Sequence, residues 1–268
     1  MAVTPGDPSP STQQKAAYVR AMFSAIARRY DLLNTLLSFG LHRRWKRYAV
    51  AVAAPPSGGL ALDVCCGTGD LAFFLHRRVG AQGRVVGVDF AEPMLRLARR
   101  RARGARGVWF VQGDAQALPF ADGTFHVATV GFGVRNVADP LGALRELHRV
   151  LRPGGRLVVL EFSRPCSRLF GALYDFYSYT AIPWVGRRLS RHPDAYWYLP
   201  TSIRGWPDQE AFRNLLQQAG FRRVWYRNLL FGAVAVHAAD KLPGRQEGRP
   251  PTANPSQAGP EGRAEVRS

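Results

Sequence analysis

The feature that most constrains the fold is an alternation of short apolar runs with longer helical patterns. Runs typical of strands occupy 60–65, 84–90, 108–113, 125–133 and 156–162. Helical patterns at 70–79, 91–102 and 140–151 lie between most of them. Strands that are apolar on both faces and joined through helices pair in parallel, with helices on both sides of the sheet. The alternation predicts a doubly wound, Rossmann-like α/β fold.

The flanking segments extend this core into one predicted domain, 15–240. Residues 15–53 have helical spacing, and we expect them to form an N-terminal helical cap. An aromatic, helix-like insertion follows at 166–205. A further helix, 208–220, precedes two β-type runs, which are too close for a crossover helix and should pair antiparallel. We therefore expect a seven-stranded, mostly parallel sheet whose last strand is antiparallel.

Both ends of the chain have compositions typical of disorder. Residues 1–14 are rich in Pro, Ser and Thr, and residues 241–268 contain only two large aliphatic side chains. The first residues lack the pattern of a signal peptide, and no apolar run reaches the length of a membrane span. Three cysteines cannot form a disulfide framework. These observations favour a cytoplasmic protein.

The chain is strongly basic, with a formal net charge of +18. Residues 1–14 carry −1 and residues 241–268 carry +2, so +17 falls on 15–240. Of the 37 basic residues 34 are Arg, which a general codon preference would also produce. An excess of this size favours attraction to anionic lipid or nucleic acid. The dense arginine run at 96–106 is interpreted as a solvated helix end.

A glycine turn follows the first strand. The segment GTGDLA at 67–72 matches the dinucleotide fingerprint, with Asp89 at the end of the next strand. Two further acids favour S-adenosylmethionine instead. Asp63, within the strand before the turn, suits a cofactor that carries an ammonium and a sulfonium, and Asp114, after the third strand, suits the adenine amino group. These acids should lie along one crevice at the carboxyl edge of the sheet.

The remaining roles at the turn follow from the same geometry. Asp89 would hold the ribose hydroxyls, and the backbone of Gly67 and Gly69 would let the cofactor approach closely. Cys65 and Cys66 are adjacent, with no CxxC spacing and no nearby His, which is unlike a metal site. We interpret both cysteines as small packing residues and expect no metal.

Three longer segments carry a family resemblance: YDLLNTLLSFGLHRRWKR, GFGVRNVAD and YLPTSIRGWPDQE. With the glycine turn, they make the chain similar to the ubiquinone/menaquinone biosynthesis C-methyltransferases, from about residue 30 to residue 237. The resemblance implies class I S-adenosylmethionine-dependent methyl transfer, with cofactor contacts at Thr68, Asp89, Asp114 and Ala115. A further family contact, usually Ser, falls on Gly131 and lacks its hydroxyl here.

The implied acceptor is a prenylated quinol. A naphthoquinol of menaquinone biosynthesis is the first expectation, and a benzoquinol of ubiquinone biosynthesis stays open. A phenolic proton near pKa 10 must be removed or its anion stabilised. We expect Arg135 to stabilise the phenolate and Asn136 to hold the other oxygen. His42 either faces the pocket or packs, and we interpret His126 and His148 as structural.

Other readings remain open at this stage: a nucleic-acid methyltransferase, an NAD-dependent oxidoreductase, or a non-catalytic cofactor-binding protein. We expect no nucleic-acid partner, because GFGVRN stands where a DNA N-methyltransferase usually has an Asn/Asp-Pro-Pro-aromatic motif. A prenylated substrate requires transient docking to anionic membrane, which makes the protein peripheral there. The expected docking residues are Arg43, Arg44, Lys46, Arg47, Arg187, Arg188 and Arg191. The oligomeric state is open between a monomer and a homodimer.

Overall fold

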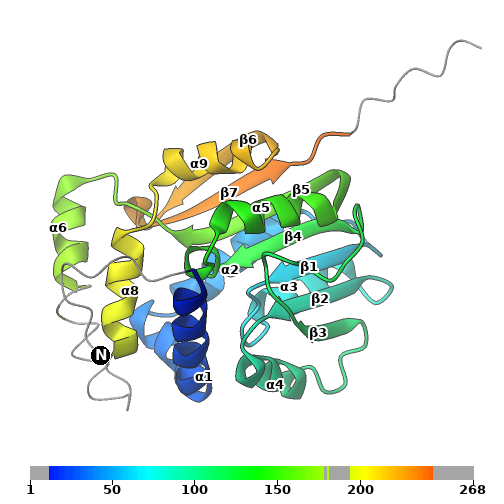
Figure 1. The fold of residues 1–268 in the computed structure, drawn as a ribbon, viewed down its shortest axis with the longest axis horizontal. Helices are drawn as coiled ribbons and strands as arrows, with labels where there is room; N and C mark the ends of the chain where they lie inside the picture. Colours follow the sequence, from blue (N-terminus) through cyan, green and yellow to red (C-terminus); the bar gives the residue numbers. More distant parts are fainter. Residues whose placement is uncertain (1–11, 178–179, 181–193, 244–268) are drawn as a thin grey trace, which may run out of the picture.

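The computed structural model describes residues 12–177, 180 and 194–243, which surround one central sheet (Figure 1). The sheet has seven strands in the order β3-β2-β1-β4-β5-β7-β6. Their bounds are β1 Leu60–Val64, β2 Arg84–Asp89, β3 Val108–Gln112, β4 Phe125–Gly131, β5 Leu151–Phe162, β6 Arg222–Leu229 and β7 Val234–Asp240.

Strand directions confirm the predicted fold class. The pairs β1–β2, β1–β4, β2–β3 and β4–β5 are parallel, and β7 pairs antiparallel with both β5 and β6. The first three strands are added outward from β1 in one direction, and β4 is then added on the opposite side of β1. The strand order therefore reverses between β1 and β4. At such a point the loops diverge and leave a crevice beyond the carboxyl ends of the strands.

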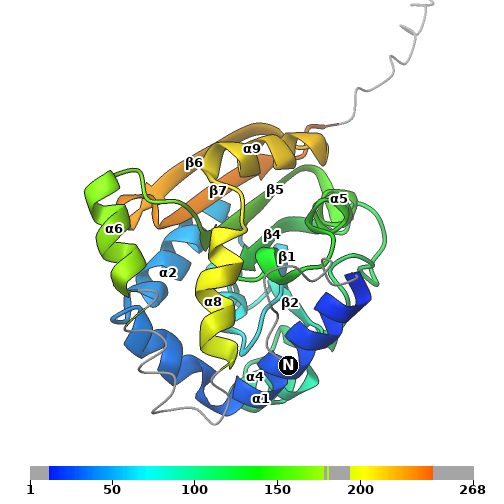
Figure 2. The same ribbon diagram turned by 60° about the vertical axis from the view of Figure 1, so that its left-hand side comes forward.

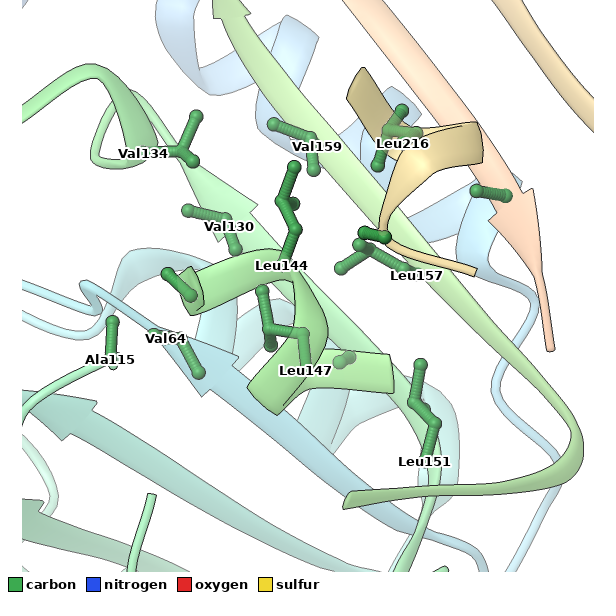
Figure 3. Packing of buried hydrophobic residues seen from close by; sticks show 14 of the residues in the cluster. Val64, Ala115, Val130, Val134, Leu144, Leu147, Leu151, Leu157, Val159 and Leu216 are labelled. Atoms are coloured by element: carbon green, nitrogen blue, oxygen red, sulfur yellow. The ribbon is translucent and has the colours of Figure 1, made fainter. Parts of the chain in front are cut away.

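Helices cover both faces of the sheet through apolar side chains. One face packs against α2 (Leu41–Ala53), α3 (Asp70–Val79) and α4 (Glu92–Arg101), with Leu75 and Leu95 fully buried. The other packs against α5 (Pro140–Val150) and α9 (Gln209–Gln218). Figure 3 shows Leu144 and Leu147 of α5 and Leu216 of α9 meeting strand residues such as Val130, Leu157 and Val159.

Three helices gather on one side of the sheet: α1 (Thr12–Leu37), α6 (Arg168–Phe176) and α8 (Asp194–Arg204) (Figures 1 and 2). α1 packs against α4 through Ala27 and Met94. Its residues also line a cavity beyond the carboxyl ends of β1 and β2. α1, the first part of the predicted cap 15–53, therefore covers the edge of the sheet where a ligand is expected, whereas α2, its second part, packs on a face of the sheet.

The helix and strand bounds depart from the sequence-based expectation in three places. α1 already begins at Thr12, inside the segment 1–14 expected to be disordered; residues 1–11 lie outside the described part of the chain. β5 begins at Leu151 rather than at 156, because Gly155 and Gly154 exchange backbone hydrogen bonds with Lys241. Lys241 belongs to the fold and not to a disordered tail, since its Nζ donates to the carbonyls of residues 148, 149 and 151.

Among the described residues, no helix combines the length and the hydropathy that crossing a membrane would require.

Candidate active site

Two neighbouring cavities lie at the carboxyl edge of the sheet. The first has a volume of about 320 Å³ and the second about 450 Å³, both within the range of small-ligand sites. Phe23 of α1 and Phe132, which follows β4, line both of them. The two cavities therefore adjoin each other at these two aromatic side chains.

The first cavity collects most of the predicted cofactor residues. Gly67, Asp89, Asp114, Ala115 and Gly131, from four different strand ends, all line it. The Asp89 carboxylate is fixed by the backbone N–H groups of residues 67 and 91, which donate at 2.8 and 2.9 Å. Burial raises the pKa of Asp89, and these hydrogen bonds act in the opposite direction. The side chain of Asp114 is exposed at the cavity.

Asp63, in contrast, lies behind the cavity and not in its wall. Its side chain is fully buried, accepts from the Ala72 N–H at 3.1 Å and accepts from Thr129 Oγ1 at 2.8 Å. α3 begins after Gly69, which offers no side chain to accept the first N–H groups of the helix. Asp63 supplies that acceptor from β1, and burial raises its pKa to about 7.

Thr68 and Gly69 also serve the architecture of the turn. The buried Thr68 hydroxyl donates to Asp31 Oδ1 of α1 at 2.7 Å, which ties α1 to the glycine turn. A Cβ at Gly69 would approach the Phe110 ring to 2.7 Å, so the missing side chain makes room for that ring. Neither residue lines the cavity, and the sequence pattern alone could not separate these roles from cofactor contact.

A charged cluster holds the turn between three helices. Arg101 of α4 donates to the Thr68 carbonyl at 2.9 Å and to Asp70 Oδ1 at 2.6 Å. Lys46 of α2 donates to the other carboxylate oxygen of Asp70 at 2.9 Å. Burial opposes ionisation of Asp70, but Lys46 and Arg101 outweigh it and lower its pKa to about 2. Lys46 is thus buried and paired, which corrects its expected place on a membrane-facing surface.

The cysteines lie within the same turn. Cys65 adopts φ +56° and lines the first cavity, and a Cβ at Gly133 would come within 2.3 Å of its Cβ. Residue 133 must therefore be glycine for the two loops to meet. Burial raises the pKa of both Cys65 and Cys66 well above the usual value, which keeps the thiols neutral. Among the described residues, no three His, Cys, Asp or Glu side chains gather around a possible metal.

The first cavity fits S-adenosylmethionine by its chemistry. Val88, Phe90 and Met94 offer an apolar surface for a purine. Asp89 offers an anchored carboxylate for ribose hydroxyls, and the exposed carboxylate of Asp114 suits an amino group. Arg20 of α1 lies 5.6 Å from the centre of the Phe90 ring, so α1 closes over this surface. When bound, the cofactor supplies an electrophilic methyl group on a sulfonium.

The second cavity is aromatic and largely apolar. Its wall includes Trp45 of α2, Phe162 of β5, Tyr174 of α6, Tyr177 directly after α6, and Tyr198 of α8. Of the aromatic stretch 174–184 within the predicted insertion, Tyr174 and Tyr177 lie in this wall; residues 178–179 and 181–184 lie outside the described part. Such a wall suits a flat, hydrophobic ring with an apolar tail.

Arg135 reaches the second cavity as half of a buried ion pair. Its Nη1 donates to Glu161 Oε1 at 2.6 Å and to the Phe132 carbonyl at 2.8 Å, and its guanidinium lies 5.0 Å from the Phe162 ring centre. Both charged side chains are at most 5% exposed. Burial raises the pKa of Glu161, and the charge of Arg135 acts in the opposite direction. Nη2 makes no hydrogen bond within the described residues, so it is free to donate to a ligand.

Asn136 lines the first cavity and not the second. Its Oδ1 accepts from the Tyr198 hydroxyl at 3.1 Å, and its Nδ2 donates weakly to the Phe132 carbonyl at 3.4 Å. Sequence reasoning missed Glu161, although it lies next to the last residue of the buried strand β5, much as Asp89 ends β2. It also missed Phe132, whose φ of +57° follows Gly131 at the end of β4.

The three candidate histidines separate as follows. His42 is buried and lines the second cavity. His126 accepts the Leu60 N–H at 3.2 Å, and His148 packs edge-on against the Phe221 ring. Both of the latter have structural contacts away from the cavities.

Comparison with known proteins gives the family. The ubiE/COQ5 methyltransferase family matches residues 11–241. Over 85% of this chain and 92% of its relative, the sequence is 46% identical to the ubiquinone/menaquinone biosynthesis C-methyltransferase UbiE of Idiomarina loihiensis. A protein of the same name from Klebsiella pneumoniae is 45% identical over 86% of this chain and 93% of the relative.

Solved structures agree on the fold. A SAM-dependent methyltransferase of Thermotoga maritima, described as a possible histamine N-methyltransferase, has a TM-score of 0.61 at 22% identity, covering 83% of this chain and 99% of the other. The [4+2]-cyclase SpnF has a TM-score of 0.64 at 19% identity, covering 90% of this chain and all of the other. With the family match over nearly all described residues, the chain belongs to the ubiE/COQ5 methyltransferase family and is an S-adenosylmethionine-dependent C-methyltransferase of quinone biosynthesis.

Proposed function

We propose that the protein methylates a ring carbon of a prenylated naphthoquinol, the demethylmenaquinol-to-menaquinol step, with a benzoquinol as the alternative acceptor. The observation that carries this proposal is the aromatic cavity of about 450 Å³ that shares Phe23 and Phe132 with the cofactor cavity. A hydrophobic ring in the second cavity lies next to a sulfonium methyl in the first. Its apolar wall suits neither a nucleotide base with its phosphates nor another polar acceptor.

Arg135 has the contacts needed to activate the acceptor. Glu161 neutralises much of its charge, yet Nη2 has no hydrogen-bond partner among the described residues, and Arg135 lines the cavity. Such a donor stabilises negative charge that develops on a quinol oxygen without reorganisation during the reaction. Asn136 is anchored by Tyr198 at the boundary with the cofactor cavity, where it suits the role of a second polar contact to the acceptor.

The experiment offers S-adenosylmethionine with two reduced acceptors, a prenylated naphthoquinone and a prenylated benzoquinone. Mass spectrometry should show that a methyl group has replaced a hydrogen on the naphthoquinol ring. The kcat/KM for the naphthoquinol should be higher than that for the benzoquinol. A higher kcat/KM on the benzoquinol would transfer the proposal to ubiquinone biosynthesis. No methylation of either quinol, in a protein that binds the cofactor, would refute the proposed function.

We also propose that the enzyme meets its substrate at an anionic membrane surface. Phe39 and Leu173 line the second cavity and are 81% and 62% exposed, so its apolar wall continues onto the surface. α2, which begins after Phe39, carries the exposed residues Arg43, Arg44 and Arg47. Each of these side chains would add about 1 kcal/mol to the binding free energy near anionic lipid. Arg187, Arg188 and Arg191, the other expected contributors, lie outside the described residues.

Vesicle co-sedimentation tests the docking proposal. Binding should increase with the anionic lipid content, decrease with salt and weaken in Phe39→Ser. Trp109→Ser is the matched control, because Trp109 is an exposed aromatic residue on the edge strand β3 and lines neither cavity. Equal binding of both variants and the wild type would remove this surface from the docking site and leave methyl transfer untouched.

A further inference from the structure

His42 lies in the second cavity with one ring nitrogen engaged. The residue is 5% exposed and stands in the first turn of α2. Its Nδ1 lies 2.7 Å from Ser38 Oγ, in the turn between α1 and α2. No described residue forms a hydrogen bond with Nε2, the other ring nitrogen, although the ring belongs to the cavity wall.

The contacts of Ser38 decide which nitrogen of His42 carries the proton. The Ser38 hydroxyl donates its single hydrogen to the Asn34 carbonyl, with an oxygen–oxygen distance of 2.6 Å. That short distance would place two bare acceptors against each other if the hydrogen turned toward His42. Ser38 Oγ must therefore accept from His42, and Nδ1 carries the proton. Nε2 then carries a bare lone pair, on a residue that lines the second cavity.

The charges around His42 keep the ring neutral. Burial lowers its pKa to about 4, and Lys46 and Arg43 on α2 contribute in the same direction. Asp70 on α3 and Asp31 on α1 act in the opposite direction. Arg135, which is paired with Glu161, also lines the cavity. With these groups in place, His42 is an unprotonated acceptor throughout the physiological range.

We propose that His42 is the general base of the reaction and takes the quinol hydroxyl proton on Nε2. The proposal rests on the proposed function, because it needs a hydroxyl-bearing ring in the second cavity. Arg135 cannot act as the base itself, since a guanidinium stays protonated in proteins. The two side chains then divide the work: Arg135 stabilises negative charge on oxygen, and His42 removes the proton.

The step balances as follows. The hydroxyl proton moves to Nε2 while the ring electrons form the new carbon–methyl bond and the sulfur–methyl bond breaks with its electron pair left on sulfur. The ring carbon now carries both hydrogen and methyl, beside a carbonyl. That hydrogen leaves as a proton to water, the carbonyl oxygen recovers the proton from the imidazolium, and the ring is aromatic again. One proton is released overall.

A weak base suffices for this transfer. The free quinol hydroxyl, with a pKa near 10, would barely lose its proton to His42 before methyl transfer. As the carbon–methyl bond forms, the same oxygen turns into a protonated carbonyl, which is a strong acid. The pKa of the imidazolium lies between the pKa of the quinol hydroxyl and that of the protonated carbonyl, so His42 accepts the proton as the carbon–methyl bond forms. General base catalysis of this kind raises the reaction rate by about 10²–10⁴-fold.

The test compares His42→Gln and His42→Asn with the control His148→Gln, whose residue lies away from both cavities. Asn replaces the Nδ1 side of the ring and Gln the Nε2 side, and neither amide is a base. Single-turnover methylation should slow by about 10²–10⁴-fold in both His42 variants while cofactor affinity stays within about twofold. The control should retain wild-type rates.

The pH dependence distinguishes a base from a packing residue. The wild-type rate should be flat between about pH 6 and 8, because His42 is already neutral there. In His42→Gln the rate should rise about tenfold per pH unit, since only pre-ionised quinol reacts. A uniformly lowered, flat profile would overturn the proposal and make His42 a packing residue. An inactive wild type would instead refute the proposed function.

A second readout needs neither substrate nor cofactor. Long-range ¹H–¹⁵N NMR of the histidine rings in the free protein should show His42 as the Nδ1–H tautomer, and Ser38→Ala should perturb this signal. An Nε2–H tautomer, or an imidazolium at neutral pH, would refute the assignment of the free lone pair.

Discussion

Replacing Asp63 with Asn should remove a pH dependence of stability that the buried carboxyl imposes. Its pKa is about 7 in the folded protein against 3.8 for the ordinary group. At about 1.4 kcal/mol for each pKa unit, this difference corresponds to about 4 kcal/mol. Because the folded-state pKa is the higher one, the protonated carboxyl stabilises the fold fully below pH 3.8. That contribution is lost as the pH rises through about 7.

The substitution keeps the local contacts. The oxygen of the introduced amide can accept the Ala72 N–H, and its NH₂ group can donate to Thr129, whose hydroxyl then donates fully to the Leu62 carbonyl that it already approaches at 3.4 Å. From about pH 5 to about pH 8 the wild type should lose about 2.5 kcal/mol of unfolding free energy relative to Asp63→Asn. The assay is urea unfolding of both proteins across this range, fitted to two states.

Asp70→Asn is the matched control. The pKa of Asp70 is about 2, so it stays ionised over the assay range, and the difference from wild type should not vary with pH. Parallel stability curves for wild type and Asp63→Asn would refute the argument that the carboxyl is held protonated by burial. Cofactor affinity is a separate measurement. A loss of affinity of tenfold or more in Asp63→Asn would mean that Asp63 contributes to cofactor binding, as expected from the sequence.

Three further substitutions have expected outcomes. Asp89→Ala should weaken S-adenosylmethionine binding by about tenfold or more in calorimetric titration, because an anchored carboxylate acceptor is worth about 1.5–3 kcal/mol; unchanged affinity in a folded variant would place the ribose elsewhere. Cys66→Ala should retain most activity and chelators should have no effect, and zinc in the purified protein would contradict this. Glu161→Gln should destabilise the protein by about 3–5 kcal/mol in urea, since it leaves the Arg135 charge buried and unpaired; a loss under about 1 kcal/mol would mean that solvent reaches the pair.

The fold could be predicted because its signals are local. Apolar strand runs, helical spacing and the glycine turn each depend on neighbours along the chain, and they suffice for the number and direction of the strands. The early start of β5 could not be predicted in this way. Arg152, Pro153, Gly154 and Gly155 have turn chemistry, but Lys241 pairs with this segment from a position 86 residues beyond Gly155.

In the candidate site, too, the residues that follow from local sequence signals could be predicted, and those that depend on tertiary contacts could not. Asp89 ends β2 and Asp114 follows β3, and their positions at the carboxyl edge of the sheet sufficed to predict that they lie at the cavity. Asp63 stands inside its strand, and no sequence pattern reveals that α3 begins at Gly69 without a side-chain cap and needs an acceptor from β1. The contact of Asp31 with Thr68, and of Arg135 with Glu161, joins segments whose meeting depends on tertiary packing.

The paired charges explain how an apolar cavity can hold this chemistry. Lys46 is paired with Asp70 and Arg135 with Glu161, so neither cation leaves an uncompensated charge in the low-dielectric interior. Under the proposed mechanism, the positive charge of the sulfonium disappears in the same step in which His42 becomes an imidazolium. The step relocates one positive charge and creates none. A neutral histidine in the resting protein is thus the state that the reaction requires, and burial beside Lys46 provides it.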